Sequence, residues 1–247
     1  MTQFKALYLT NAREFTRDRM PVFLVMLLPI ALASFFGLVF GGVSEEPGAV
    51  RTIDLFMPGM LGIAMLWLGL FGTALPLMQQ RVNQVLRRLS LTPVRPATML
   101  FAQIGWRVTV GLIQAALFLL VGALAFQVGV DGNKLLFLAA VILGTLLFVS
   151  LGYVMAGLAP SEEGLMAITQ IVNFPLMFLS GGLFPVESLP SYLQPLVALS
   201  PLTFLTDALK QLMAGAPALY PLWLDFAVMG GWLTVLLVLG VKFWRWE

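Results

Sequence analysis

Few residues in this chain could do chemistry, and the residue types that it lacks exclude most familiar catalysis. The 247 residues include neither histidine nor cysteine. Imidazole acid–base catalysis, cysteine nucleophiles and the usual zinc sites are therefore excluded. No glycine is followed by lysine, so the phosphate-binding loop G-x-x-x-x-G-K-[ST] is absent from the sequence. We expect no catalytic residue, no metal site and no cofactor in this chain.

The most specific group of charged residues lies in the sequence QQRVNQVLRRLSLTPVRP at residues 79–96. Its apolar residues recur at the spacing of one helical face: Val82, Val85, Leu86 and Leu89. Basic and amide side chains fill the rest of the pattern: Arg81, Gln84, Arg87 and Arg88. We expect a short, basic, amphipathic helix within the cytoplasmic loop 79–98. It could anchor on anionic lipid or dock onto a partner protein, and its position favours neither.

The N-terminal segment 1–20 is a second basic element. Its larger apolar residues share one helical face: Phe4, Leu7, Tyr8 and Phe15. Lys5, Arg13 and Arg17 lie elsewhere on the same helix. The pattern predicts a cytoplasmic amphipathic helix that rests on the membrane surface. Whether it also contacts a cytoplasmic partner stays open.

A membrane domain must hold these elements. About 60% of the residues are hydrophobic and 11% are charged, against roughly 25% charged in a soluble domain. A span needs about 20 apolar residues to cross roughly 30 Å of hydrocarbon. We expect an all-α polytopic membrane protein with a single transmembrane domain over residues 1–247. Six transmembrane helices are predicted, at residues 21–43, 55–78, 99–126, 135–159, 165–184 and 222–243.

The distribution of basic residues orients this domain. With six spans, the cytoplasmic segments hold ten Lys and Arg, whereas the outer loops hold three, Arg51, Lys134 and Lys210. We therefore expect both termini in the cytoplasm and the chain in the cell (inner or plasma) membrane.

Two further ionisable residues, Arg107 and Asp225, are expected at the membrane interface. Each is followed by an uncharged run long enough to span the membrane. The spans then contain almost no ionisable side chains, unlike those of ion-driven transporters. Energy for any transport is expected to come from elsewhere.

Residues 185–216 are apolar but unsuited to crossing the membrane. They contain four prolines: Pro185, Pro190, Pro195 and Pro201. Each proline removes a backbone donor that hydrocarbon cannot replace. We expect a re-entrant hairpin on the outer face, with a first helix over Leu189–Leu199. The second begins at Ser200 as N-cap, with Pro201 in its first turn, and ends at Gly215. The alternative is a surface loop that only connects two spans.

Three pieces of the sequence together resemble a known family. They are LRRLSLTP at Leu86–Pro93, FLSGGLFPVESLP at Phe178–Pro190 and SPLTFLTDALK at Ser200–Lys210. Their order and placement are similar to those of the permease subunit of ABC type-2 exporters, in the drug- and lipophile-efflux branch. In that family two permeases assemble with two separate P-loop ATPase subunits, which bind MgATP.

The resemblance implies roles for the three regions. The coupling helix that docks on the ATPase would include Arg81, Gln84, Val85, Arg87, Arg88 and Leu89. The connecting helix beside it would include Lys5, Arg13 and Arg17. The outer gate would include Pro185, Pro190, Pro195, Pro201, Leu205, Asp207 and Leu209.

The expected function is outward transport of a hydrophobic or amphipathic cargo, such as a drug or lipid. The expected partners are the ATPase, a second permease chain in a homo- or heterodimer, and membrane lipids, with no nucleic acid. The alternatives are a polysaccharide or glycolipid export permease and, from a different class, an ion-coupled secondary transporter.

Overall fold

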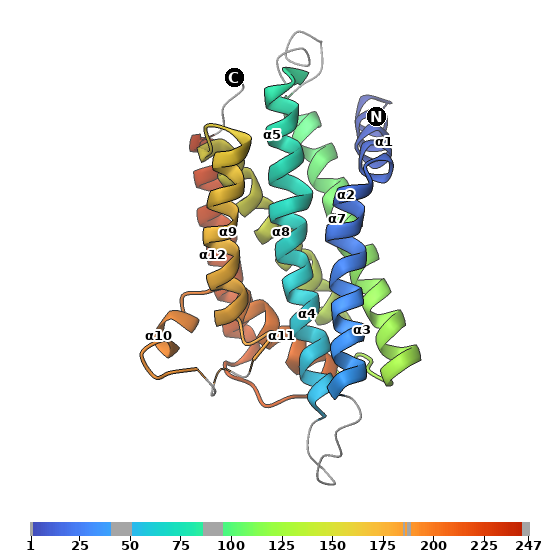
Figure 1. Ribbon diagram of the computed structural model, residues 1–247, viewed down its shortest axis with the longest axis vertical. Coiled ribbons are helices and arrows are strands. Elements are labelled where there is room, and N and C mark those ends of the chain that lie inside the picture. The colour runs from blue at the N-terminus through green and yellow to red at the C-terminus, as the bar shows by residue number, and fades with distance from the viewer. Residues whose placement is uncertain (1, 41–50, 86–95, 185, 187–188, 244–247) are drawn as a thin grey trace.

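The computed structural model describes the chain except for residues 1, 41–50, 86–95, 185, 187–188 and 244–247 (Figure 1). Within these described residues, helix is the only regular secondary structure, so the expected all-α class is confirmed. The elements, with η marking π-helical segments, are α1 (Thr2–Arg17), α2 (Arg19–Val22), η1 (Phe23–Leu27), α3 (Leu28–Phe40), α4 (Thr52–Gly69), η2 (Leu70–Ala74), α5 (Leu75–Val82), α7 (Pro96–Val121), η3 (Gly122–Phe126), α8 (Lys134–Leu158), α9 (Glu162–Leu179), α10 (Gln194–Val197), α11 (Pro201–Ala214) and α12 (Leu222–Phe243).

Four helical stretches are long and apolar enough to cross a membrane. They are Thr52–Val82, Thr98–Phe126, Lys134–Leu158 and Leu222–Gly240. A shorter apolar helix covers Phe23–Val39, where the first span is expected. The fifth predicted span forms α9, which begins with two glutamates and carries Pro175. The structure supports a polytopic membrane protein, and the count of six spans remains a prediction.

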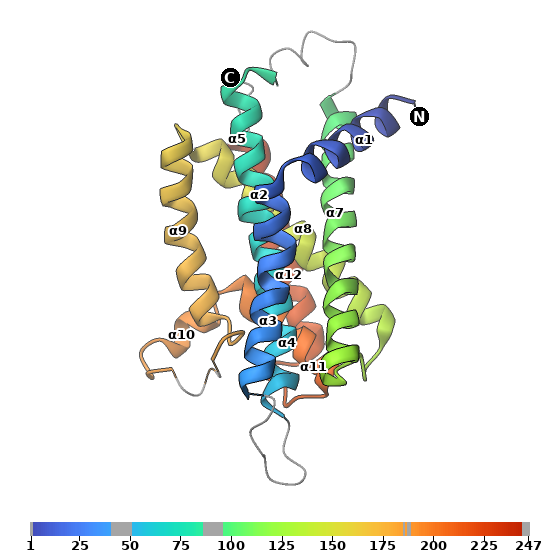
Figure 2. The ribbon, with the colours of Figure 1, turned by 45° about the vertical axis from the view of Figure 1, so that its right-hand side comes forward.

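The long helices run side by side, and α1 lies obliquely across one end of them (Figures 1 and 2). α4 occupies the centre and contacts α3, α7, α8 and α11. Every residue of α4 from Met57 to Leu66 is buried. An apolar helix that is buried on all sides forms the core of a bundle. We call the two ends of the bundle the α1 end and the α11 end; the last turn of α12 lies at the α1 end (Figure 1).

Two glycines bring α4–η2 and α8 into close contact. A Cβ atom on Gly69 would lie 2.1 Å from the carbonyl oxygen of Phe148. A Cβ atom on Gly152 would lie 2.2 Å from the carbonyl oxygen of Gly69. Small residues of this kind let membrane helices approach until their backbones touch. This crossing fixes the core on which both polar regions described below are built.

Two π-helical segments are each followed by a proline two positions later. η1 precedes Pro29 and η2 precedes Pro76. Proline has no N–H and leaves the carbonyl four residues earlier without its helical donor. For Pro29 that carbonyl belongs to Val25, and the side-chain amide of Gln114 on α7 donates to it. The buried Gln114 thus joins α7 to η1 at the position where the helix lacks a donor.

Candidate functional site

The second half of the predicted hairpin has the expected helix. α11 begins at Pro201 after Ser200 and ends at Gly215, which adopts a left-handed conformation. These bounds confirm the prediction. The Ser200 hydroxyl oxygen, however, accepts from no backbone N–H of the first turn and has no partner among the described residues. The position of the N-cap was therefore predicted correctly, but its side-chain hydrogen bond is absent.

The first predicted helix, Leu189–Leu199, is wrong in extent. Only α10, Gln194–Val197, is helical, and turns lie on both sides of it. Proline explains the short length, because Pro190 cannot donate inside a helix and Pro195 is tolerated only in the first turn of α10. Both prolines are exposed, and Pro185 lies outside the described residues.

α11 packs inside the bundle and not over it. Its Leu205 and Leu209 have no exposed surface, and the helix contacts α4, α8, α9 and α12. Its polar face also makes bonds within the protein: Thr206 donates to the carbonyl of Ser180, and Lys210 donates to the carbonyl of Gly181. α11 is therefore a fixed part of the core at this end.

A cavity of about 270 Å³ lies beside these contacts. It is bounded by the first turns of α4, by residues 181–184 with Val186, by one turn of α11, and by Pro217 and Leu219. Apolar side chains such as Phe56, Leu183 and Phe184 form much of the lining, and Asp207 and Lys210 add one carboxylate and one ammonium group. Because drug-sized pockets usually exceed about 300 Å³, this cavity suits part of an amphipathic molecule.

Asp207 joins α11 to the segment that leads into α12. Its Oδ1 accepts from the backbone N–H of Leu219 at 3.1 Å, and its Oδ2 accepts from that of Tyr220 at 2.9 Å. The Gln211 amide donates to the same Oδ2 at 3.1 Å. Burial raises the pKa of the Asp207 carboxyl above its ordinary value, and these donors oppose that shift.

The position of Asp225 at the membrane interface remains a prediction, but the structure shows which residues surround it. Its side chain is fully buried in the first turn of α12. Its Oδ2 accepts from the Gln211 amide at 3.0 Å, so that Gln211 links the carboxyls of Asp207 and Asp225. The sequence did not predict this burial, because the apolar run after Asp225 does not show which neighbours cover the first turn of α12.

At the α1 end, the basic helix predicted to begin at Arg81 is interrupted. Arg81 belongs to the last turn of α5, and its guanidinium donates to the carbonyls of Ala156 and Ala159 at the end of α8, at 3.3 and 3.5 Å. A turn follows at Asn83 and Gln84, where Gln84 adopts a φ of 55°. Helix resumes at Val85. The continuous helix from Arg81 is therefore wrong; Arg87, Arg88 and Leu89 lie outside the described residues.

The predicted N-terminal amphipathic helix forms as α1. Its apolar face packs on α7, where Tyr8 and Phe15 meet the ring of Trp106 at centroid distances of 5.5 and 6.0 Å. Three basic residues of α1 are exposed, Lys5, Arg13 and Arg17. The apolar face of α1 thus contacts protein. The expected contact with lipid or a partner would be made by its basic side.

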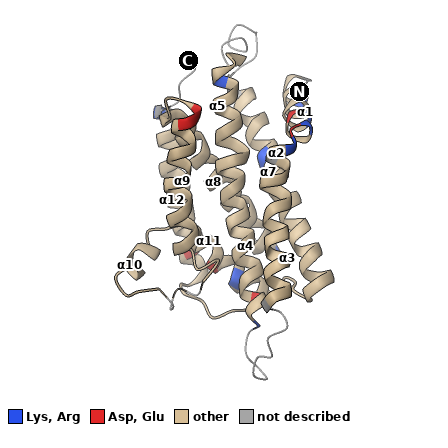
Figure 3. Ribbon diagram, in the orientation of Figure 1, with Lys and Arg blue, Asp and Glu red and all other residues tan. Residues whose placement is uncertain are grey.

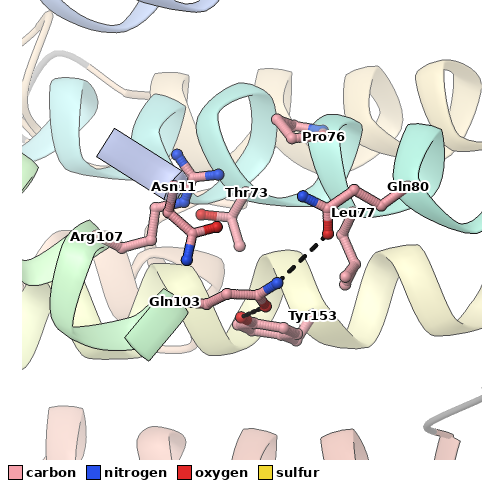
Figure 4. A pocket seen from close by; sticks show the side chains of 8 residues that line it. All are labelled: Asn11, Thr73, Pro76, Leu77, Gln80, Gln103, Arg107 and Tyr153. Carbon is pink, nitrogen blue, oxygen red and sulfur yellow. Dashed lines mark hydrogen bonds between the residues drawn. The ribbon is translucent and has the colours of Figure 1, made fainter. Parts of the chain in front are cut away.

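A chain of polar side chains at this end was not predicted from the sequence. The hydroxyl of Tyr153 donates to Gln103 at 2.7 Å, and the amide of Gln103 donates to Gln80 at 3.3 Å (Figure 4). Gln80 in turn donates to Glu14 of α1 at 3.2 Å. The signal available in the sequence was the presence of amide residues inside apolar runs, such as Gln103 within the span 99–126.

Arg107 extends toward the same cluster. It lines, with Gln80, Gln103 and Tyr153, a cavity of about 10 Å³ (Figure 4). That volume is close to the minimum for one water molecule. Arg107 also lies 5.8 Å above the ring of Phe15. Most other charged residues gather at the two ends of the bundle (Figure 3).

A profile of the ABC-2 type transporter family matches residues 2–214. The chain belongs to this family. The match runs from α1 through α11, so it includes Asp207, most of the residues that line the cavity and the whole polar chain at the α1 end. α12, which carries Asp225, lies beyond the matched residues.

Several curated proteins are similar to this ABC-2 chain. ABC transporter G family member 20 of Dictyostelium discoideum is 28% identical over 196 residues, which cover 77% of this chain and 26% of that protein. Nodulation protein J of Neorhizobium galegae is 28% identical over 78% of this chain and 72% of its own length. The probable multidrug ABC transporter permease YbhR of Escherichia coli strain K12 is 25% identical over 61% and 41%. The chain thus spans about a quarter of the Dictyostelium protein.

These relatives are transport components. Among the described residues, no group of three or more Asp or Glu side chains lies close enough together to hold a metal ion. The family implies an ATPase partner, because ABC transporters combine a membrane permease with an ATPase. The roles predicted for single residues remain predictions.

Proposed function

We propose that this chain is the membrane subunit of an ATP-driven exporter and that a separate chain hydrolyses ATP. One observation carries the proposal: the profile of the ABC-2 type transporter family matches residues 2–214, and ABC transporters combine a membrane permease with an ATPase. MgATP would then bind to the partner, and this chain would be non-catalytic. The chain would lie in the cell (inner or plasma) membrane, with both termini in the cytoplasm.

The α1 end is the proposed docking surface for the ATPase. Val82 and Val85 are exposed there despite their apolar side chains. Two arginines, Arg87 and Arg88, follow directly in the sequence. Exposed apolar residues flanked by basic ones suit a protein interface in which a few apolar contacts supply affinity and charge supplies orientation. The exposed basic residues of α1 extend this surface.

The α11 end is the proposed exit for the cargo. Its cavity of about 270 Å³ combines an apolar lining with Asp207 and Lys210. A hydrophobic or amphipathic cargo fits this combination. The printed name of the relative YbhR, a probable multidrug permease, agrees with such a cargo.

A glycan-bearing cargo is the alternative within the same family. Phe174, Phe178 and Phe184 form a row of nearly parallel rings, with centroids 6.5 and 6.3 Å apart. All three are exposed. Flat aromatic faces of this kind can pack against sugar rings as well as against lipid.

A second permease copy is proposed to cover α9. Gln170 is exposed near the middle of this helix, beside the exposed apolar residues Ile171 and Phe174. The Gln170 side-chain oxygen accepts from the Asn173 amide at 3.5 Å, but in hydrocarbon its N–H groups would still need acceptors. A facing protein surface would supply them.

The experiment is reconstitution with the ATPase in liposomes and measurement of ATP-dependent transport. Arg87→Glu/Arg88→Glu should leave membrane insertion intact and lower transport-coupled ATP hydrolysis about tenfold, equivalent to about 1.4 kcal/mol of docking energy. Lys134→Glu is the matched control, because Lys134 is exposed in the first turn of α8 at the other end. Unchanged coupling in the double variant would reject the docking surface. Failure of any ATPase to co-purify would reject the function.

The ion-coupled alternative has one observation in its favour, the buried carboxyls of Asp207 and Asp225. Intramembrane carboxyls often mark ion pathways. The two functions separate cleanly in liposomes: an ion-coupled carrier transports with an ion gradient and no ATP, whereas the proposed exporter does not.

A further inference from the structure

The carboxyl pair at the α11 end contains a polar group that its surroundings do not satisfy. Asp225 has no exposed surface. Its Oδ1 accepts no hydrogen bond from any described residue. Its Oδ2 has one donor, Gln211, which also serves Asp207. A buried carboxylate with so few donors is unfavourable, since a buried charge needs full pairing.

The Gln211 amide has fewer hydrogens than the acceptors around it require. The Gln211 Nε2 atom has two hydrogens but lies 3.0–3.1 Å from three acceptors: Asp207 Oδ2, Asp225 Oδ2 and the Tyr220 carbonyl. Turning the amide around would place its oxygen against the same three acceptors, which is worse. One more hydrogen is needed to satisfy the cluster.

We propose that Asp207 and Asp225 hold one bound proton between them, so that the pair is a proton-binding site joining α11 to α12. Asp225 carries the proton, because Asp207 already accepts from the backbone N–H groups of Leu219 and Tyr220 and from Gln211. A protonated Asp225 provides the missing hydrogen and removes the second negative charge. This site does not depend on the proposed transport function.

Among the described residues, no other group in the surroundings would compensate two negative charges. On α11 the neighbouring titratable side chain is Lys210, which donates to Gly181 and lowers the pKa of Asp207 only as the last of several influences. The connecting segment contributes Tyr220, whose ring stacks on Phe204 at 5.0 Å. At the same end, α4 presents Asp54, which pairs with Arg51 at 2.8 Å. α8 presents the exposed Lys134.

A proton bound only in the folded state makes stability depend on pH. Between the ordinary aspartate range, near 3.9, and the higher pH at which the folded pair releases its proton, the folded protein holds more protons than the unfolded chain. Stability therefore falls as the pH rises. Replacing the protonated carboxyl by an amide, which donates at every pH, should abolish this dependence.

The first test is infrared spectroscopy of the full chain in lipid nanodiscs, with isotope-labelled aspartate carboxyls. The chain has five aspartates, so bands can be assigned with single variants. At about pH 7, where free aspartates are ionised, one protonated-carboxyl band is expected. Asp225→Asn should remove it, and Asp131→Asn, which changes an exposed aspartate, should retain it. Absence of the band from wild type, or its survival in Asp225→Asn, overturns the proposal.

The second test is thermal unfolding of the same samples from about pH 5 to about pH 8, a range in which free aspartates stay ionised. The midpoint of wild type and of Asp131→Asn should fall by a few degrees, whereas that of Asp225→Asn should stay level. Equal slopes in all three proteins overturn the proposal. If Asp225→Asn does not fold, the wild-type band and its loss with rising pH still decide the question, and a wild type without either refutes the site.

Discussion

The two polar regions of this protein lie at opposite ends of one bundle and are built differently. At the α11 end, Asp207 and Asp225 are carboxyls, and backbone N–H groups supply two of the donors. At the α1 end, Tyr153, Gln103 and Gln80 are neutral and bond one another in series. The first region is buried, and its Asp207 also borders the cavity of about 270 Å³. The second leads through Gln80 to the exposed Glu14 of α1.

This difference indicates how firmly each end is held. Asp207 has three donors and fixes the segment between α11 and α12, so its loss leaves several buried groups unsatisfied at once. Each member of the neutral chain has one or two partners, and its last link lies at the surface, where water can replace a lost partner. The α11 end should therefore be the more sensitive to substitution.

The largest effect is expected from Asp207→Leu. Leucine fills the space of the aspartate side chain with apolar atoms but leaves the N–H groups of Leu219 and Tyr220 without their acceptor. We expect a loss of roughly 3 kcal/mol or more in the free energy of unfolding, at about 1 kcal/mol or more per buried unsatisfied group. Chemical denaturation in detergent measures it. Asp131→Leu, at an exposed position, is the control and should change little; similar losses in both would remove the contrast.

A smaller effect is expected from Tyr153→Phe in the neutral chain. The ring stays in place, and only the hydroxyl that donates to Gln103 at 2.7 Å is lost. A neutral hydrogen bond of this kind contributes about 1 kcal/mol. Tyr192→Phe is the matched control, because Tyr192 is 74% exposed. A loss as large as that of Asp207→Leu would show that the α1 end is held as firmly as the α11 end.

The sequence predicted the helical class, the bounds of α11 and the amphipathic character of α1. These features depend on local patterns: uninterrupted apolar runs, the Ser200-Pro201 start and the Gly215 end of one helix, and a helical repeat of Phe and Tyr. They need no knowledge of which helices are neighbours.

The predictions that failed depend on tertiary neighbours. The link between Asp225 and Gln211 was not predicted, because hydropathy along one helix cannot reveal a donor on another helix. Arg81 was assigned to a separate docking helix, because the sequence does not show that the carbonyls ending α8 lie within its reach. The polar chain of Tyr153, Gln103 and Gln80 was missed for the same reason, since its members come from three helices.

The smallest effect concerns the coupling between the two regions, measured with the double variant Asp207→Leu/Tyr153→Phe. α8 carries Tyr153 and also contacts α11, and Tyr153 follows Gly152, whose contact with Gly69 ties α8 to α4. A disturbance at Asp207 therefore has a physical route to Tyr153. The two regions nevertheless share no hydrogen-bond partner among the described residues, and substitutions at separate sites usually add within about 0.5 kcal/mol. We expect the losses in unfolding free energy to add within that margin. A larger coupling energy would mean that α8 transmits changes between the two ends. The carboxyl region at the α11 end and the neutral chain at the α1 end would then be parts of one connected system.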